Sequence, residues 1–260
     1  MKTATRRKTE RQAARTLSNA PQASSRFLAA VPEAGRGLIS VIIPTLNEQT
    51  GIVACLDRVS RAPGVEAIVV DGGSRDATVE TARRTGAKVI AAPRGRACQM
   101  NAGAAASQGD ILLFLHADTS LSPGWDSEVR RVLARPGVAA GAFAFRLDRR
   151  TAGLRFIELC VAWRCRLASM PYGDQGLFLR RDVFLAAGGF PDLPIMEDCE
   201  LVRRLKKRGR IIVSPAPALT SARRWQQKGI LATTAFNSLV VVAFYLGCSP
   251  SLLRRLYDRA

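Results

Sequence analysis

The stretch LISVIIPTLNE, residues 38–48, decides the fold of this chain of 260 residues. Its first six residues are almost all apolar and run directly up to Pro44, a pattern typical of a strand that is buried on both faces of a sheet. Such strands belong to parallel sheets whose faces are covered by helices. We therefore expect the chain to continue as alternating strands and helices.

Three further short apolar runs follow. They lie at residues 67–70, 88–91 and 111–115. Segments of helical character separate them at residues 52–59, 76–86 and 96–107, and Pro123 suits the first turn of another helix. This order predicts an α/β fold with a Rossmann-like, mostly parallel sheet flanked by helices. In such sheets ligands bind beyond the carboxyl ends of the strands.

Polar segments stand directly after the four predicted strands, where a ligand would bind. They are residues 44–48, 71–74, 93–96 and 116–118. Three of them contain the carboxylates Glu48, Asp71 and Asp118, and the fourth contains two arginines. The two glycines after Asp71 would let a ligand approach the backbone closely, and Asp71 can accept hydrogen bonds from a base or a ribose. The alternative for Asp71 is a plain turn capped by its side chain.

The residues at these strand ends suit a nucleotide with a bound metal ion. Asp118 is a hard oxygen ligand for Mg²⁺ or Mn²⁺ held partly by substrate phosphates, and Arg94 and Arg96 can contact the phosphates. His116, the only histidine, is either a second ligand or a packed side chain. The chain has neither the GxGxxG pattern of dinucleotide-binding folds nor the GxxxxGK[ST] pattern of a P-loop.

The second half of the chain contributes another pair of acids. A polar turn at residues 171–176 precedes a short apolar strand at 177–179, and Glu197 and Asp198 begin a helix whose later part is very basic. Acids at a helix N-terminus and bases at its C-terminus complement the helix dipole, which is a purely structural explanation of the pair. The functional alternative is a general base.

The charge of the chain indicates anionic partners. There are 39 Lys and Arg residues against 21 Asp and Glu, a formal net charge of +18. Nucleotide phosphates, anionic lipid and nucleic acid all fit this excess, as does a surface that is simply rich in arginine. Residues 1–37 carry eight basic and two acidic residues with weak apolar periodicity. We expect them to form a disordered basic tail, or an arm for anionic lipid or nucleic acid.

The cysteines and the first residues favour a cytoplasmic protein. None of the six cysteines forms a CxxC pair, so we expect them to be reduced and structural. No apolar segment typical of a secretory signal follows the first charges.

The C-terminal stretch from residue 230 to 247 is mostly apolar and has basic flanks. A spanning helix needs about 20 predominantly apolar residues, which makes this stretch borderline. A helix packed on the domain, an in-plane membrane anchor and a membrane span all remain open. Bases on both flanks give no clear orientation, which disfavours a span.

Together these motifs resemble family 2 of the glycosyltransferases, which have the GT-A fold. The resemblance runs from Ile39 to Trp225 and rests on SVIIPTLNE at 40–48, VVDGGSRD at 69–76, HAD at 116–118 and Glu197-Asp198. It implies a GT-A domain at residues 38–225 and a C-terminal helical appendage at 226–260. A subgroup associated with radical-SAM and selenium-domain proteins is similar through RGRACQMN at 94–101, YGDQ at 172–175 and TSARRW at 220–225.

The resemblance also implies the roles of individual residues in a transferase that uses Mn²⁺ or Mg²⁺. Implied for the nucleotide are Pro44, Thr45, Asn47, Glu48, Asp71, Gly72, Arg94 and Arg96. Implied for the metal are Asp118 and His116, for catalysis Asp198 and Glu197, and for the acceptor or diphosphate Gly173, Asp174, Gln175, Arg224 and Trp225. Asp198 would deprotonate the acceptor hydroxyl, so that the sugar is transferred by direct displacement with inversion.

Two departures from the family pattern matter. The first position of the family's Asp-x-Asp metal motif is His116 here, which leaves the metal claim resting on Asp118. The processive synthases have Gln-x-x-Arg-Trp, whereas Ser221 stands in the place of that glutamine. We therefore expect transfer of a single sugar rather than synthesis of a polymer.

Two other classes of protein remain as alternatives. A nucleotidyltransferase shares a similar core but usually has a Gly-rich basic loop after its first strand, whereas residues 44–48 are acidic and lack glycine. A non-enzymatic protein that binds anions or membrane would fit the charge but not the four acids at the predicted site. For the transferase we expect a nucleotide-sugar donor and no nucleic acid. The acceptor is open, and a lipid-linked acceptor would suit a membrane anchor. An anionic membrane surface is a further expected partner.

Overall fold

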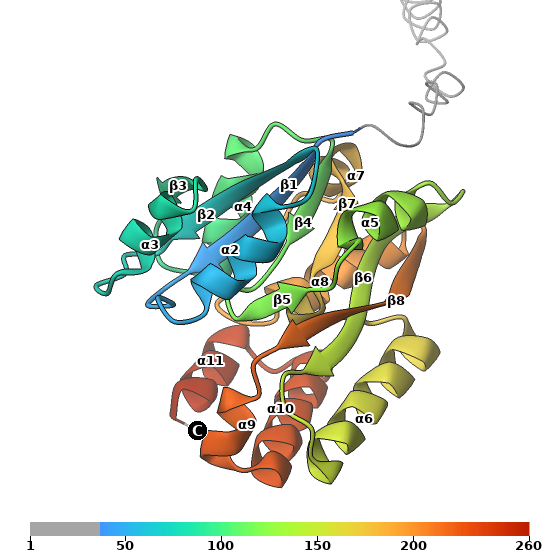
Figure 1. The fold of residues 1–260 in the computed structure, drawn as a ribbon. Coiled ribbons are helices and arrows are strands. Elements are labelled where there is room, and N and C mark those ends of the chain that lie inside the picture. Colours follow the sequence, from blue (N-terminus) through green and yellow to red (C-terminus); the bar gives the residue numbers. More distant parts are fainter. Residues whose placement is uncertain (1–36, 260) are drawn as a thin grey trace, which may run out of the picture. The chain divides into compact units, whose positions relative to one another are not determined.

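The computed structural model describes residues 37–259 and contains one eight-stranded mixed sheet with the order β3-β2-β1-β4-β7-β6-β8-β5 (Figure 1). The expectation of a basic tail at residues 1–37 concerns residues that, apart from Gly37, lie outside this described part. Helices lie on both faces of the sheet, as the sequence predicts.

The first half of the sheet is parallel, and the predicted alternation is confirmed. It consists of β1 (Ile39–Thr45), α2 (Ile52–Ser60), β2 (Val65–Asp71), α3 (Thr78–Arg84), β3 (Lys88–Ala91), α4 (Arg96–Ala106) and β4 (Ile111–Phe114). Strand β1 pairs in parallel with both β2 and β4, and Thr45 lies opposite Asp71. The polar ends of these strands therefore meet at one edge of the sheet.

The second half of the sheet contains antiparallel pairs. Its elements are β5 (Thr119–Leu121), α5 (Trp125–Leu133), β6 (Val138–Leu147), α6 (Ala152–Ala168), the 3₁₀ turn η1 (Gly173–Gln175), β7 (Leu177–Arg180), α7 (Arg181–Ala186), α8 (Glu197–Lys206) and β8 (Arg210–Thr220). Strand β7 is antiparallel to β4 and β6, β8 is parallel to β6, and β5 is antiparallel to β8. The sequence predicted β7 and the start of α8, but none of β5, β6 and β8.

Side chains of β1 alternate between two hydrophobic cores, one on each face of the sheet. Val41 and Ile43 pack with Leu56 of α2 and Val129 of α5, whereas Ile42 packs with residues of α4 and α8. All three β1 side chains are fully buried. The sequence interpretation of β1 as a strand buried on both faces is therefore confirmed, and the layers on either side fix the position of its polar end.

The C-terminal helices α9 (Arg223–Lys228), α10 (Ile230–Tyr245) and α11 (Pro250–Arg259) lie together with α6 at one end of the sheet (Figure 1). Val240 of α10 and Leu253 of α11 are buried against Ile195 and Met196, just before α8. No helix in residues 37–259 is long and apolar enough to cross a membrane, and this includes the stretch for which the sequence left a span open.

Candidate active site

The ends of β1 and β2 are held together by the buried side chain of Gln99, which lies in α4. Its amide nitrogen donates to the carbonyl oxygens of Thr45 at 2.9 Å and Val70 at 2.8 Å. A Cβ added at Gly72 would lie 3.1 Å from the Gln99 side chain, so a larger residue would push against Gln99. Gln99 therefore positions the loop that begins at Asp71, a role the sequence interpretation did not assign to it.

Asp71 is buried, and one of its two carboxylate oxygens lacks a hydrogen-bond partner. Oδ2 accepts the backbone N–H groups of Gly73 and Ser74, both at 2.9 Å, while Oδ1 has no partner. Buried acceptors are normally satisfied, and an exception calls for an explanation such as an absent ligand. The turn alternative is therefore correct for Oδ2, and Oδ1 is free to accept a donor from a base or a ribose.

The loop after β1 is tied to the loop after β2. Asn47 has a positive φ of 56°, its N–H donates to Ser74 Oγ at 2.9 Å, and its side-chain oxygen accepts the Arg75 N–H at 2.9 Å. The Glu48 N–H donates to Thr78 Oγ1 at 2.8 Å. Asn47 thus braces the loop, while the Glu48 side chain stays available to the pocket next to it.

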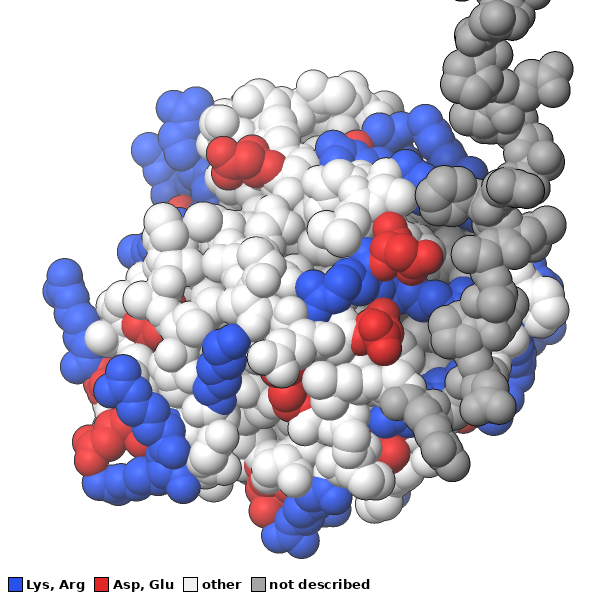
Figure 2. All heavy atoms as spheres, turned by 90° about the horizontal axis from the view of Figure 1, so that it is seen from above, with Lys and Arg blue, Asp and Glu red and all other residues white. Residues whose placement is uncertain are grey.

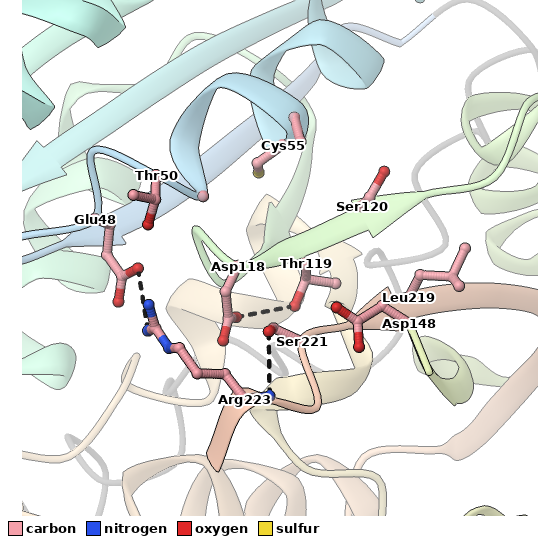
Figure 3. Close-up of a pocket in the computed structure, with 12 residues that line it drawn as sticks. Glu48, Thr50, Cys55, Asp118, Thr119, Ser120, Asp148, Leu219, Ser221 and Arg223 are labelled. Carbon is pink, nitrogen blue, oxygen red and sulfur yellow. Dashed lines mark hydrogen bonds and ion pairs between the residues drawn. The ribbon is translucent and has the colours of Figure 1, made fainter. Parts of the chain in front are cut away.

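A pocket of about 370 Å³ opens between Glu48 and Asp118 (Figure 3). Its other lining residues are Thr50, Gly51, Ala54, Cys55, Thr119, Ser120, Asp148, Leu219, Ser221 and Arg223. Glu48 Oε2 lies 3.8 Å from Arg223 Nη2. Burial and the charge of Asp118 raise the pKa of Glu48, and Arg223 opposes this shift. Two carboxylates facing one another here favour a cation or a proton donor between them.

The donor set of the pocket suits a metal ion that a substrate helps to hold. Asp118 points into the pocket, and its Oδ1 accepts only a long hydrogen bond of 3.4 Å from Thr119 (Figure 3). Among residues 37–259 no group of three or more His, Cys, Asp and Glu side chains could hold a metal by itself. Mg²⁺ and Mn²⁺ are commonly bound by one or two carboxylates and completed by substrate phosphates, and Asp118 fits that arrangement.

A second cluster of polar groups lies beside the pocket, around the turn η1. Asp198, at the start of α8, accepts the Gly173 N–H through Oδ2 at 2.7 Å and the Cys199 N–H through Oδ1 at 2.8 Å. A Cβ added at Gly173 would lie 3.1 Å from His116 Nε2 and 3.2 Å from Asp198 Oδ2. His116 and Asp198 therefore lie close against Gly173, and the three residues line a small cavity of about 10 Å³.

Burial shifts the pKa values of two groups in this cluster, Asp174 and His116. Burial raises the pKa of Asp174 to about 6, Arg164 opposes the shift, and the charges of Asp198 and Asp118 add to it. Burial and the positive charge of Arg96 lower the pKa of His116, which favours a neutral imidazole at pH 7. A neutral imidazole can act as a metal ligand or a hydrogen-bond acceptor, so both predicted alternatives for His116 stay open.

Arg96 is paired with a carboxylate rather than free for a phosphate. Arg96 Nε lies 2.7 Å from Glu197 Oε1, and the Glu197 side chain is only 2% exposed. Burial raises the pKa of Glu197, and Arg96 acts in the opposite direction. Glu197 thus anchors α4 to α8 next to Asp198, through an ion pair that the sequence analysis did not predict.

Replacing Arg96 with alanine should destabilise the protein by about 2–4 kcal/mol, because it leaves the buried Glu197 carboxylate without its charge partner. The midpoint of urea unfolding at pH 7.5 measures this change. The double variant Arg96→Ala with Glu197→Gln should recover part of the loss, since no buried charge remains. Arg94→Ala is the matched control, because Arg94 is exposed at the same turn. Equal stability of the Arg96→Ala and Arg94→Ala variants would contradict this account.

Two of the residues predicted for the acceptor or diphosphate, Gln175 and Trp225, have partners within the fold, and their predicted role stays a prediction. Gln175 is 1% exposed, and its amide nitrogen donates to the Phe143 carbonyl at 3.0 Å, so it joins the η1 turn to β6. Trp225 packs on Phe145 with ring centroids 6.1 Å apart. The side chain of Arg224 lies outside the described part of the structure.

Three polar residues of the pocket that follow β6 and β8 were not among the predicted site residues. Asp148 follows β6, and Ser221 and Arg223 follow β8. Asp148 Oδ1 accepts the Ala222 N–H at 2.8 Å, which joins the two strand ends. The rule that ligands bind after the strands would have found all three residues if β6 and β8 had been recognised.

Carboxylates follow β1, β2 and β4 at one edge of the sheet, and two of them, Glu48 and Asp118, line one pocket. This arrangement fits a transferase core of the GT-A type. The sequence pattern of Glycosyl transferase family 2 matches residues 40–181, which is more than half of the chain. The chain therefore belongs to glycosyl transferase family 2 and is an enzyme. The nucleotidyltransferase and non-enzymatic alternatives do not apply.

Two groups of mycobacterial relatives match shorter segments. The chain is 36% identical over 87 residues to an uncharacterized glycosyltransferase of Mycobacterium tuberculosis, a match that covers 33% of this chain and 39% of that protein. It is 39% identical over 93 residues to a PGL/p-HBAD biosynthesis glycosyltransferase of Mycobacterium bovis, which covers 32% of this chain and 36% of the relative. The match thus spans little more than a third of each relative.

Solved structures share the fold over most of the chain. A mannosyltransferase from Pyrobaculum calidifontis, in complex with GDP-Man and Mn²⁺, has a TM-score of 0.63 at 21% identity and covers 85% of this chain and 68% of its own. Glucosyl-3-phosphoglycerate synthase from Mycobacterium tuberculosis, in complex with Mn²⁺, UDP-glucose and phosphoglyceric acid, has a TM-score of 0.54 at 25% identity and covers 71% of each chain. These likenesses confirm the predicted GT-A fold.

Proposed function

We propose that this glycosyltransferase moves one sugar from a UDP-sugar, or another nucleotide sugar, to an acceptor hydroxyl with the help of Mn²⁺ or Mg²⁺. The observation that carries the proposal is the pocket between Glu48 and Asp118, with Asp71 at the neighbouring strand end and Asp198 beside it. The complex of glucosyl-3-phosphoglycerate synthase with Mn²⁺ and UDP-glucose supports it by analogy.

The nucleotide would lie across the ends of β1 and β2. The free Oδ1 of Asp71 is a suitable acceptor for an N–H of the base. Pro44, Thr45 and Glu48 would line the ribose side, with Asn47 holding their loop in place. Arg94 is exposed at the turn before α4 and remains a candidate for the phosphates, whereas Arg96 would act through Glu197.

Asp118 would hold the metal ion, with His116 as a second candidate ligand. Bound there, Mn²⁺ or Mg²⁺ would neutralise the charge that develops on the departing diphosphate. Arg223 lies on the opposite wall of the pocket and would add a positive charge to the same end of the donor.

Asp198 is the group we assign to the acceptor proton. Its carboxylate is oriented by two backbone N–H donors and lines the small cavity that it shares with Gly173 and His116. As the acceptor oxygen bonds to the anomeric carbon, Asp198 would take its proton and the bond from that carbon to the diphosphate would break. The displacement proceeds from the face opposite the leaving group, so the anomeric configuration is inverted.

Asp174 and Gly173 would lie nearest the acceptor. Ser221, in place of the glutamine of processive synthases, favours transfer of one sugar.

Acceptors with a lipid anchor would reach this site from a membrane. A cytoplasmic enzyme at the membrane face would suit such acceptors. No feature of the described pocket calls for nucleic acid. Membership of the subgroup associated with radical-SAM proteins stays a prediction.

A thermal-shift and calorimetric screen of nucleotide sugars, each with and without Mn²⁺, tests the proposal. We expect UDP and one UDP-sugar to bind only weakly without metal and at least about tenfold more tightly with it. Asp182→Asn, which changes an exposed carboxylate of α7, is the matched control for effects of surface charge. Binding of every nucleotide with equal affinity in both conditions would contradict a metal-assisted diphosphate site.

A further inference from the structure

Helix α6 carries an apolar stripe that faces away from the sheet. Phe156, Leu159, Trp163 and Leu167 are 62%, 58%, 61% and 76% exposed. Their spacing of three, four and four residues places them on one face of the helix. The opposite face, with Leu154 and Ile157, is buried against β6. The helix is therefore apolar on two sides, and only one of them is covered.

The neighbouring helices α10 and α11 add exposed apolar side chains at the same end of the sheet (Figure 1). Leu239 and Val242 of α10 are 64% and 54% exposed, and Leu246, directly after α10, is 80% exposed. In α11 Leu252 and Leu256 are 44% and 45% exposed. Helix α10 contacts both α6 and α11. We call these nine side chains the apolar helical surface. Exposed apolar surfaces that are clustered in this way mark sites of protein or membrane interaction.

The exposed charges next to the apolar helical surface are almost all positive. Arg155 and Arg166 lie directly beside the stripe of α6, and Arg255 and Arg259 are exposed on α11. The only acid of α6, Glu158, is buried. The acid of α11, Asp258, is paired with Arg254. The surface is thus apolar in its centre and cationic at its margin. Strand β7 and helix α7 lie at the opposite end of the sheet (Figure 1).

We propose that the apolar helical surface binds the interface of an anionic lipid bilayer, with α6 and α10 lying in the membrane plane. Trp and Phe favour the headgroup boundary, and Arg side chains beside them bind anionic headgroups. None of the described helices is long and apolar enough to cross the membrane, which fits in-plane contact. A second copy of this chain is a poorer partner, because a two-fold interface would oppose the same arginine margins.

The orientation that follows places the active-site pocket near the membrane. Asp148 lies in the segment that leads from β6 into α6, and Arg223 begins α9, which contacts α10. The pocket therefore borders the helices that we place on the bilayer. The membrane proposal itself does not depend on the identity of donor or acceptor.

Flotation of the full chain with vesicles tests the proposal. We expect binding to vesicles of phosphatidylglycerol and phosphatidylcholine, weak binding to phosphatidylcholine alone, and partial loss of binding between about 0.1 and 0.5 M NaCl. The double variant Phe156→Ser with Trp163→Ser should bind at least about tenfold more weakly, because two interfacial side chains are lost. Leu185→Ser in α7, where Leu185 is 65% exposed at the other end, should bind like the wild type.

Three results would overturn the proposal. The first is the absence of vesicle binding at low salt. The second is equal binding by the double variant and the wild type, which would assign binding to other basic residues. The third is a wild-type dimer in sedimentation velocity that the double variant dissolves, without any vesicle binding, which would identify a second copy as the partner. Unchanged unfolding temperatures of both variants verify that their folds are intact.

Discussion

Replacing Asp118 with asparagine should lower sugar transfer by about 10²–10³-fold and should remove the dependence of UDP binding on Mn²⁺. Asp118 is the carboxylate that follows β4 and points into the pocket. Asparagine keeps the size of the side chain but loses the charge that a divalent ion needs. The diphosphate would then leave without its charge being neutralised, which raises the barrier of the chemical step.

Calorimetry of UDP with and without Mn²⁺ separates this loss from a general defect. In the wild type the metal should strengthen UDP binding, and in Asp118→Asn the two isotherms should coincide. The pKa of Glu48 should also fall towards its usual value in the variant, because the neighbouring negative charge that helps to raise it has gone. Metal-dependent UDP binding that survives in Asp118→Asn would reject Asp118 as the ligand.

The sequence predicts the first half of the fold well because its signals are local. Residues 38–43 are a nearly continuous apolar run, and such runs are typical of strands buried on both faces. The position of Glu48, Asp71 and Asp118 directly after such runs predicts them as site residues. The parallel register of β1 and β2, which sets Thr45 opposite Asp71, confirms that the ends of these two strands lie side by side.

The second half resists prediction because β6 and β8 lack such signals. Strand β6 contains several alanines and a glycine, and β8 contains Pro215 and Pro217, which usually indicate a loop. The structure accommodates the prolines at an irregularity, where Phe143 pairs with Ser214 but the next residue, Ala144, pairs with Pro217. Without these strands, Asp148, Ser221 and Arg223 could not be assigned to the pocket.

Ion pairs between residues far apart in the chain could not be predicted from the sequence either. Arg96 follows a predicted strand and looks like a phosphate ligand, yet its partner is Glu197, a hundred residues further along the chain. The sequence offers a helix-dipole role and a general base as explanations for the acids at the start of α8, and neither includes this ion pair. Glu197 is held in a buried ion pair, while Asp198 lines the small cavity at Gly173.

Replacing Asp198 with asparagine should lower kcat by about 10³-fold while leaving the affinity for UDP and Mn²⁺ close to that of the wild type. The asparagine oxygen can still accept the N–H of Gly173, which holds the η1 turn, whereas the bond from the Cys199 N–H to Oδ1 is lost. The amide has no basicity at neutral pH, so the acceptor hydroxyl keeps its proton as its oxygen approaches the sugar. The chemical step is therefore lost. Donor binding should be kept, because the donor site that we propose lies across the ends of β1 and β2.

Rates of UDP release with saturating donor, together with UDP calorimetry, distinguish this outcome from that of Asp118→Asn, in which metal-dependent binding fails as well. Glu197→Gln is the matched control for the adjacent acid, since it should change stability through Arg96 more than it changes kcat. Normal turnover by Asp198→Asn would reject the assignment of the base. A loss of turnover that Glu197→Gln reproduces in full would instead show that α8 acts as a scaffold, with no proton passing to Asp198.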